Sequence, residues 1–468
     1  MSTPPTHTDD PLLEPEDLAN LEREGTIIII PNSSAHRIHK RRLNRSSEEE
    51  YEDVQLPSPS TTVSSLHSTT ALTSEDYQTI PEFLICRDTL RFLGFNTATA
   101  DEVWDRWVGW GPDGGREIDG GPVTFLSMAI AHIRSPDFNA STDHDYTWLA
   151  TMDACGIDQP LQTTIMMPFY KDIRLTASCK YWLIDTIKSR YSSLKEIQAA
   201  SKERVIAAHR AASRPGGSQQ QHGIPSTGQQ DGGSSVSSAF SSLPGVSSIH
   251  ISAPEVRAIA PGLTVLYKGA NITRLQSAFD AQGRMTEPQH LMSSGVGDFN
   301  NTSSNSIYMA VNFDIAKKYA AWAKRRDPNQ HAGILRLEVP NAAIESLTHP
   351  HKIAVFWPSQ RWRELVWTCR RGNRLHGNMV QIRYSTLMIG TICGKPNDVI
   401  ASLPSPDDIT ERMLVRNPSG GPAVQYAFTG DQGADFLVDN CSRASKIHPL
   451  AARDLDRVES EDLNISGG

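Results

Sequence analysis

Residues 305–326 constrain the fold more than any other part of this sequence. The alternating stretch Ile307–Val311 predicts a short strand, and the residues after it have the periodicity of an amphipathic helix. Small and aromatic residues recur on one helical face, at Ala316, Tyr319, Ala320 and Ala323. Such a face can pack closely on a sheet, and Asn312 is a favourable residue to cap the helix. The pattern therefore predicts a strand joined directly to a helix, inside a mixed α+β body.

Composition divides the rest of the chain. Residues 1–80 are rich in Ser, Thr, Pro, Asp and Glu, with little hydrophobic periodicity, so we expect a disordered N-terminal tail. Residues 213–254 form a Ser/Gly/Gln-rich linker, and residues 438–468 an acidic C-terminal tail. Two folded bodies remain, a separate all-helical module at 81–212 and an α+β body at 255–437. Nothing in the helical module suggests catalysis, so we expect it and the tails to bind unknown protein partners.

Charge is shared unevenly between these parts. Residues 1–80 contain 6 lysines and arginines against 14 acidic residues, whereas residues 255–400 contain 18 against 10. A basic body suits an anionic ligand such as a nucleotide or a nucleic acid. The alternative is a solvated basic surface whose charge the acidic tails offset, and the sequence leaves both open.

Cysteine spacing and the first residues bear on the cellular setting. The six cysteines show no Cys-x-x-Cys or Cys-His cluster, so we expect neither a metal site nor a disulfide scaffold. The polar, acidic start is not typical of a signal peptide, and Ile27–Ile30 is too short to span a membrane. We therefore expect an intracellular protein, cytoplasmic or nuclear. The basic cluster Arg37–Arg45 leaves a nuclear signal open.

Short alternating stretches continue through the second body. They predict strands around Leu263–Lys268, Ile334–Val339, Ile353–Trp357, Trp362–Cys369 and Met379–Ile389. On this interpretation Glu364 lies on a strand and shares its face with Trp362. A Gly-, Ser- and Asn-rich stretch at 283–304 has the composition of a mobile lid.

Four motifs occur in an order that resembles a known family. They are Leu266-Tyr267-Lys268-Gly269, Asp298-Phe299 ahead of Ile307-Tyr308, the Ala-rich helix 314–324, and Trp362-Arg363-Glu364. Over about residues 255–390 the chain resembles the ADP-ribosyltransferase-like fold, in its uncharacterised, divergent branch. The resemblance implies that Lys268 contacts NAD and that Tyr308 and Trp362 line the nicotinamide site. It also implies that Glu364 stabilises the oxocarbenium-like transition state.

Two functions follow from this resemblance. The first is an enzyme that cleaves the nicotinamide–ribose bond of NAD and passes the ribosyl group to protein, nucleic acid or water. The second is a non-catalytic interaction scaffold that retains the fold. Lys268 stands where the family has Arg or His and lacks the planar fork of a guanidinium. Asn300 follows Phe299 where the family has Gly-x-Gly. Both departures favour the second function.

Overall fold

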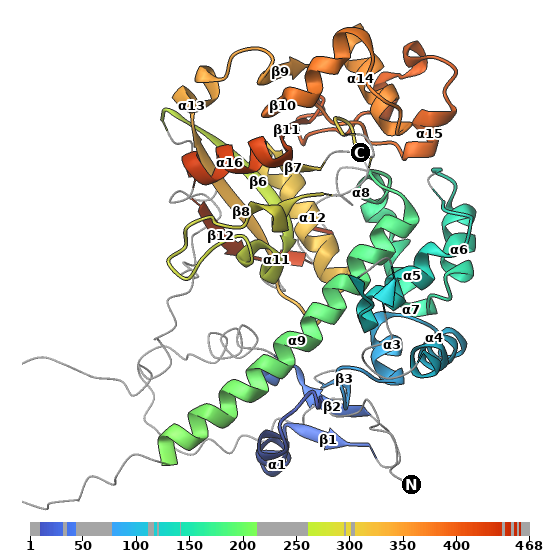
Figure 1. The fold of residues 1–468 in the computed structure, drawn as a ribbon, viewed down its shortest axis with the longest axis vertical. Helices are drawn as coiled ribbons and strands as arrows, with labels where there is room; N and C mark the ends of the chain where they lie inside the picture. The colour runs from blue at the N-terminus through green and yellow to red at the C-terminus, as the bar shows by residue number, and fades with distance from the viewer. Residues whose placement is uncertain are drawn as a thin grey trace, which may run out of the picture.

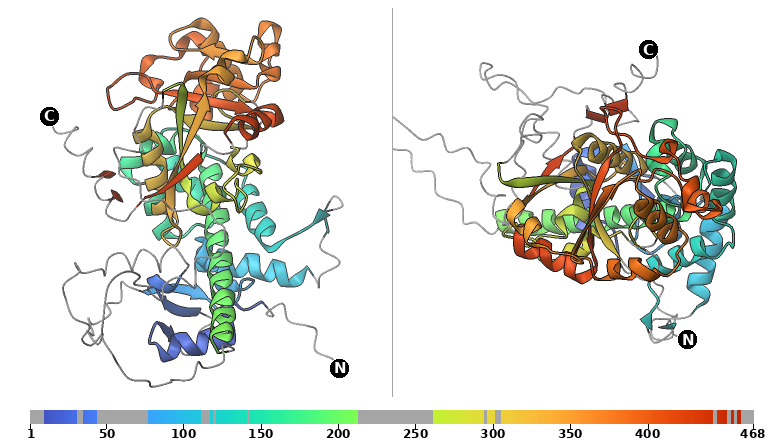
Figure 2. Two further views of the ribbon diagram at one scale, coloured as in Figure 1. Left: turned by 90° about the vertical axis from the view of Figure 1, so that its left-hand side faces the viewer. Right: turned by 90° about the horizontal axis from the view of Figure 1, so that it is seen from above.

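Three parts of the molecule are arranged along one long helix, α9 (Cys179–Ala212). A small N-terminal sheet lies at one end, a group of helices lies along its side, and a large sheet domain lies at the other end (Figures 1 and 2). The expected linker at 213–254 lies outside the described residues. The computed structural model describes residues 10–30, 35–43, 77–110, 117–118, 121–140, 142–212, 261–293, 296–300, 305–441, 445–450, 454–455 and 458–459.

The N-terminal part forms a helix and a small antiparallel sheet. Its elements are α1 (Pro15–Arg23), β1 (Ile27–Ile29), β2 (Ala35–His39) and β3 (Tyr77–Pro81), in the sheet order β1-β2-β3. Asp17 anchors α1 to the far end of α9, because it accepts hydrogen bonds from Ser201 (2.7 Å) and Arg204 (2.9 and 2.8 Å). The expectation of disorder is therefore wrong for these residues. Composition averaged over 80 residues concealed a few apolar side chains, such as Leu12 and Ile38, that are fully buried.

Helices form the second part, as the sequence predicts. Asn96 caps α4 and Thr124 caps α5 through their side-chain oxygens, and Asp158 caps α7 in the same way. The helices are α3 (Arg87–Leu93), α4 (Thr97–Gly109), α5 (Phe125–Arg134), α6 (Asp145–Ala154), α7 (Gln159–Ile165) and α8 (Lys171–Arg174), and two short strands, β4 (Glu117–Ile118) and β5 (Gly121–Pro122), form a hairpin.

A mixed sheet dominates the third part, which confirms the α+β class. Among the described residues it has seven strands in the order β12-β8-β6-β7-β11-β10-β9. β9 and β10 are parallel, and the other neighbours are antiparallel. The strands are β6 (Leu263–Asn271), β7 (Ser306–Ala310), β8 (Ala332–Pro340), β9 (Lys352–Val355), β10 (Leu387–Thr391), β11 (Val424–Thr429) and β12 (Ser445–Pro449).

Helices cover this sheet on both sides. α12 packs on β6 and β8, whereas α16 packs on β8 and β11 from the other face. Alternate residues of β6 show the two faces, because Tyr267 joins the core that contains α12 and Leu266 joins the core that contains α16. The helices are α11 (Ile272–Gln276), α12 (Phe313–Arg326), α13 (Asn341–Ser346), α14 (Gln360–Arg370), α15 (Asn397–Ser402) and α16 (Gly430–Cys441).

The helical part and the sheet domain share one hydrophobic core. Trp182 of α9 meets Trp322 of α12 edge-on at 4.5 Å between ring centroids, and the Arg326 guanidinium lies over both rings. Asp327, which is fully buried, accepts hydrogen bonds from two serine hydroxyls of α9, Ser189 and Ser193. The expected separate module is therefore joined to the sheet domain by apolar packing and by buried hydrogen bonds.

Two expectations for the second body are wrong. Residues 362–369 belong to helix α14, not to a strand, because their buried residues recur with helical spacing at Trp362, Leu365, Val366 and Cys369. Residues 377–384 form a 3₁₀ helix ahead of β10, where a continuous strand was expected. The expected acidic tail also contains structure, because α16 extends to Cys441 and β12 pairs with β8.

Candidate functional site

The large sheet opens between its two central strands. β6 pairs with β8 over its whole length, and β7 pairs with β11 over its whole length. Between β6 and β7, however, the register contains a single pair, Tyr267 with Ala310. The strands therefore diverge beyond this pair, and the residues after it, from Lys268 onward, do not form a ladder with β7.

Helix α12 packs very closely against β6 next to this opening. A Cβ atom added at Gly269 would lie 1.9 Å from the carbonyl oxygen of Ala316, which is far inside contact distance. Only glycine permits the helix backbone to approach the strand so closely. The sequence pattern of small residues on this helix predicted such packing, and the N-cap Asn312 is confirmed, since its side chain accepts from the Asp314 N–H at 2.8 Å.

A cavity of about 450 Å³ occupies the opening in the sheet. This volume lies within the range of roughly 300–1,000 Å³ that is typical of small-molecule sites. Its lining comes from β6, β7 and α12, from Ser293 and residues 296–300, and from the first turn of α9. Its polar side chains include Arg134, Lys180, Tyr181, Lys268, Tyr308 and Tyr319, together with Asp298 and Arg370.

Lys268 extends into the opening and replaces a missing ladder hydrogen bond. Its Nζ donates to the carbonyl oxygen of Tyr308 at 3.1 Å. Burial lowers the pKa of Lys268 to about 7, repulsion from Arg274 adds to the shift, and attraction to Asp185 opposes it. The Lys268 side chain lines the cavity on one side and is surrounded by protein on its other sides. The resemblance placed this lysine at a ligand, and the structure places it in the cavity wall.

Tyr308 also lines the cavity, but its hydroxyl belongs to the loop beside it. The hydroxyl donates to the Asn300 side chain and accepts from the Phe299 N–H at 3.3 Å. Burial and the Asp298 carboxylate both raise its pKa, so this tyrosine stays neutral. Its role in this geometry is to hold residues 297–300 against the sheet.

Asp298 and Arg370 form a buried ion pair at one side of the cavity. Two guanidinium nitrogens approach the same Asp298 oxygen at 2.9 and 2.7 Å, and the other oxygen accepts from Gln425 (2.7 Å) and from the Cys393 N–H (2.9 Å). Burial opposes the charge on Arg370, but attraction to Asp298 outweighs this and raises its pKa. Both side chains are only 3 % exposed.

Arg370 also joins the sheet domain to the helical part. Its remaining donors reach the carbonyl oxygen of Thr176 (2.9 Å), the Asn397 side chain (2.7 Å) and the carbonyl oxygen of Cys393 (3.1 Å). Arg370 therefore uses all of its donors within the protein. Its position one helical turn after Val366, on the buried face of α14, was the signal that distinguishes it from a solvated arginine.

The wall also contains further basic and aromatic side chains. Lys180 donates to the backbone carbonyls of Arg134 (3.2 Å) and Pro136, whereas the Arg134 side chain is exposed and forms no ion pair with described residues. Burial raises the pKa of Tyr319 to about 12, and its hydroxyl meets that of Thr176 at 3.2 Å. Sequence analysis missed Arg134, Lys180 and Tyr181, because they belong to the helical part.

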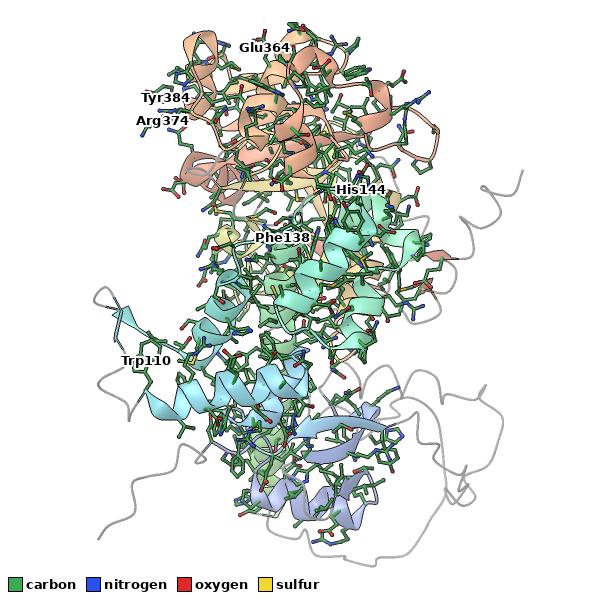
Figure 3. All side chains as sticks on the ribbon, turned by 90° about the vertical axis from the view of Figure 1, so that its right-hand side faces the viewer. Trp110, Phe138, His144, Glu364, Arg374 and Tyr384 are labelled. Atoms are coloured by element: carbon green, nitrogen blue, oxygen red, sulfur yellow. The ribbon has the colours of Figure 1, made fainter. Side chains whose placement is uncertain are left out.

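Glu364 and Trp362 do not join this site. Glu364 lies on helix α14 near the outer end of the sheet domain (Figure 3), where its side chain accepts weakly from Gln360 at 3.4 Å. Trp362 is fully buried, and its indole N–H donates to the carbonyl oxygen of Thr391 at 2.9 Å. The structure therefore brings Lys268 and Tyr308 together and leaves the other two candidates outside the cavity lining. The strand interpretation of 362–369 caused this error.

The described residues contain neither a metal site nor a membrane-spanning helix. Among the described residues, no group of three or more His, Cys, Asp or Glu side chains is placed to bind a metal ion. In the same part of the chain, no helix combines the length and the apolar character needed to cross a membrane. Comparison of the chain with protein-family models, with curated proteins and with solved structures found no match.

Proposed function

We propose that this chain is a nucleotide-binding protein with an ADP-ribosyltransferase-like domain, whose cavity binds NAD or a related pyrophosphate nucleotide without cleaving it. One observation carries the proposal. Among the described residues that line the cavity between β6 and β7, Arg134 and Lys180 carry positive charge beyond the paired Arg370, and the one carboxylate, Asp298, is already bound. An excess of positive charge at such a site favours an anionic ligand.

The lining fits the parts of such a nucleotide. Arg134 and Lys180 would contact phosphate oxygens, and the first turn of α9 adds the positive end of a helix dipole. The first backbone N–H groups of α9 already have acceptors; the Lys180 N–H, for example, donates to the Asn139 side chain. The helix therefore contributes the electrostatic field of its dipole and few free hydrogen-bond donors. Tyr181 and Tyr319 offer aromatic surface to a planar ring.

The same lining gives no support to a transfer reaction. Stabilising an oxocarbenium-like centre needs a carboxylate that faces the ligand. Asp298 is held by Arg370, Gln425 and a backbone N–H, and Glu364 lies outside the cavity lining. We therefore assign binding and no catalytic step. An intracellular location, as expected from the sequence, would give the site access to NAD.

Isothermal titration calorimetry on the full chain tests the proposal. NAD and ADP-ribose should bind, and nicotinamide alone should bind far more weakly because it lacks the phosphates. Lys180→Met should weaken NAD binding on the order of tenfold, as expected for loss of a charge-assisted contact. Glu364→Gln is the matched control and should change nothing. Absence of any heat or melting shift with both nucleotides would overturn the proposal, and nicotinamide release above the buffer rate would overturn its non-catalytic part.

An interaction scaffold is the second candidate. Two aromatic side chains of the helical part, Phe138 and Tyr146, are 49 % and 70 % exposed. Figure 3 shows Phe138 and His144 on the surface of this part, and His144 stacks on Tyr146 at 5.7 Å between ring centroids. Exposed aromatic residues are enriched where proteins bind one another. Replacement of Phe138 and Tyr146 by serine should abolish capture of partner proteins if this surface serves a scaffold.

A further inference from the structure

Lys268 differs from the surface lysines of this chain in what it contacts. Lys171, Lys318 and Lys395 each form an ion pair with an aspartate, at 3.1, 3.3 and 2.9 Å. Lys268 donates to one backbone carbonyl, and none of the described carboxylates lies within ion-pair distance of it. Its amine is thus placed at a cavity without a partner that holds it in the charged form.

The charges around Lys268 also favour a neutral amine. Arg274 of α11 repels the ammonium, and the attraction of Asp185 is shared, because Asp185 pairs with Arg326 at 2.9 Å and with Arg274 at 3.2 Å. Lys180 adds positive charge to the same cavity, whereas Arg370 and Asp298 compensate one another there. With a pKa of about 7, about half of the Lys268 amines are neutral at pH 7. An ordinary exposed lysine is neutral in only about one molecule in 10³ at that pH.

We propose that the Lys268 amine is a nucleophile that forms an imine with a phosphate-bearing aldehyde bound in this cavity. The inference rests on the cavity being a ligand site for phosphate compounds, as proposed above. Of the two lysines among the described lining residues, Lys268 donates to one backbone carbonyl, whereas Lys180 is engaged with two. Arg134, exposed and without an ion pair to described residues, supplies a contact for the phosphate.

The reaction balances without any further reactant. The nitrogen lone pair attacks the aldehyde carbon and a C–N bond forms. The C=O π bond breaks, and the oxygen takes up the first of the two nitrogen protons. The resulting carbinolamine passes the second nitrogen proton to its hydroxyl through solvent and loses water. The products are an imine between Nζ and the former aldehyde carbon, and one water molecule.

Pyridoxal 5′-phosphate is a suitable probe, because it is an aromatic aldehyde with one phosphate. The full chain is incubated with it at pH 7, reduced with borohydride to fix the imine, and digested for peptide mass spectrometry. We expect modification of Lys268 to be faster than that of the exposed Lys446 on the order of 10²-fold, since the neutral fraction of its amine is larger. Equal rates at the two lysines would overturn the inference.

The pH dependence gives a second test that needs no variant. Modification of Lys268 should level off above about pH 7 to 8, because its amine is then mostly neutral. Modification of an exposed lysine should keep rising about tenfold per pH unit to near pH 10. A rate at Lys268 that rises in parallel with the exposed lysines contradicts the proposal.

Variants separate this inference from the proposed function. Lys268→Arg replaces the amine by a guanidinium that is always protonated, so it should abolish imine formation at the site. Arg134→Ala, or pyridoxal without phosphate, should slow modification of Lys268 on the order of tenfold. If Lys268 is modified but the chain does not bind NAD, only the nucleotide-binding proposal is refuted. If the chain binds NAD but Lys268 is not modified, only the proposal of a nucleophilic Lys268 is refuted.

Discussion

At the scale of single residues, two basic side chains line one cavity and meet opposite conditions. Arg370 has a carboxylate partner and three further acceptors, so its charge is fully compensated. Lys268 has a single carbonyl acceptor, and its pKa falls to about 7. Burying a charge without a partner is costly, so the first site stabilises the fold and the second weakens it near neutral pH.

Replacing Lys268 by methionine should therefore stabilise the chain at low pH. The pKa of this lysine is about 7 when folded and 10.5 as its ordinary value, so between these pH values the unfolded chain binds more protons. The free energy of unfolding of the wild type therefore rises with pH across this window. Below pH 7 the destabilisation caused by Lys268 is complete. The variant should melt higher at pH 6, and the difference should shrink toward pH 10. Lys446→Met, at an exposed position, should show no such trend.

Asp298→Asn tests the compensated pair. The substitution leaves the Arg370 guanidinium buried without a counter-charge, so we expect a loss of about 3–5 kcal/mol in the free energy of unfolding. Urea denaturation measures it. Arg371→Met, on the exposed neighbour of Arg370, should cost well under half as much, and comparable losses in the two variants would argue against the pair as the main anchor.

At the scale of elements, periodicity predicted most of what the structure contains. The strand and helix at 305–326, the long α9 and the β8 strand all follow strong local patterns. Helix α14 was not predicted, because Trp362, Glu364 and Val366 alternate as in a strand when only a few residues are considered. The helical spacing of Trp362, Val366 and Cys369 is visible only over a longer stretch of sequence.

Only the part of the candidate site that lies on locally patterned strands could be predicted from the sequence. Lys268 and Tyr308 lie on strands whose pattern is local, so their approach to one cavity followed from the resemblance and the alternation of side chains. The cations of the helical part, Arg134 and Lys180, reach the cavity only because α9 packs on α12. Such a contact between segments far apart in sequence leaves no mark on the local pattern of either segment.

Helix α14 provides a pair of contrasting substitutions. Glu364→Gln, at a partly exposed position with one weak contact, should change stability by less than about 0.5 kcal/mol. Trp362→Ala removes a fully buried ring and its hydrogen bond to Thr391, so it should cost about 3–5 kcal/mol. Chemical denaturation of both variants compares them directly, and a large loss for Glu364→Gln would restore a structural role to that carboxylate.

The contact between α12 and β6 gives a second prediction at this scale. Gly269→Ala places a methyl group against the Ala316 carbonyl, so helix and strand must separate, at a cost of about 1–3 kcal/mol. Gly109→Ala, at the end of α4 with no atom within 4 Å of the added carbon, is the control and should be neutral or slightly stabilising. Thermal melting of the two variants should separate them clearly.

At the scale of the whole molecule, the two expected bodies behave as one. A single core continues from α9 into α12 and β8, and Asp327 with its two serine partners lies inside it. The cavity exists only because these parts are held together, since α9 supplies one wall and the sheet supplies the other. Ligand binding is therefore a property of the assembled chain.

Cleavage of the chain between Ser213 and Ser252 tests this unity. With a specific protease site inserted there, the two products should elute together on size exclusion and should retain NAD binding. Denaturant should separate them, because the joint core buries large apolar side chains such as Trp182 and Trp322 from both pieces. Two fragments that part spontaneously and stay folded would show that the interface is weak.

The segment around 445–459 has a consequence for how this protein is made. β12 adds the last strand to the free side of β8, and Leu450, Leu455 and Val458 then fill the core that the helical part shares with α12. One carboxylate oxygen of Glu459 accepts hydrogen bonds both from the Tyr170 hydroxyl of the helical part (2.8 Å) and from Arg325 of α12 (2.8 Å). On the ribosome, therefore, neither half can reach its final packing until this segment has left the exit tunnel. Apolar surface on both halves stays open during translation, when chaperones have access to it.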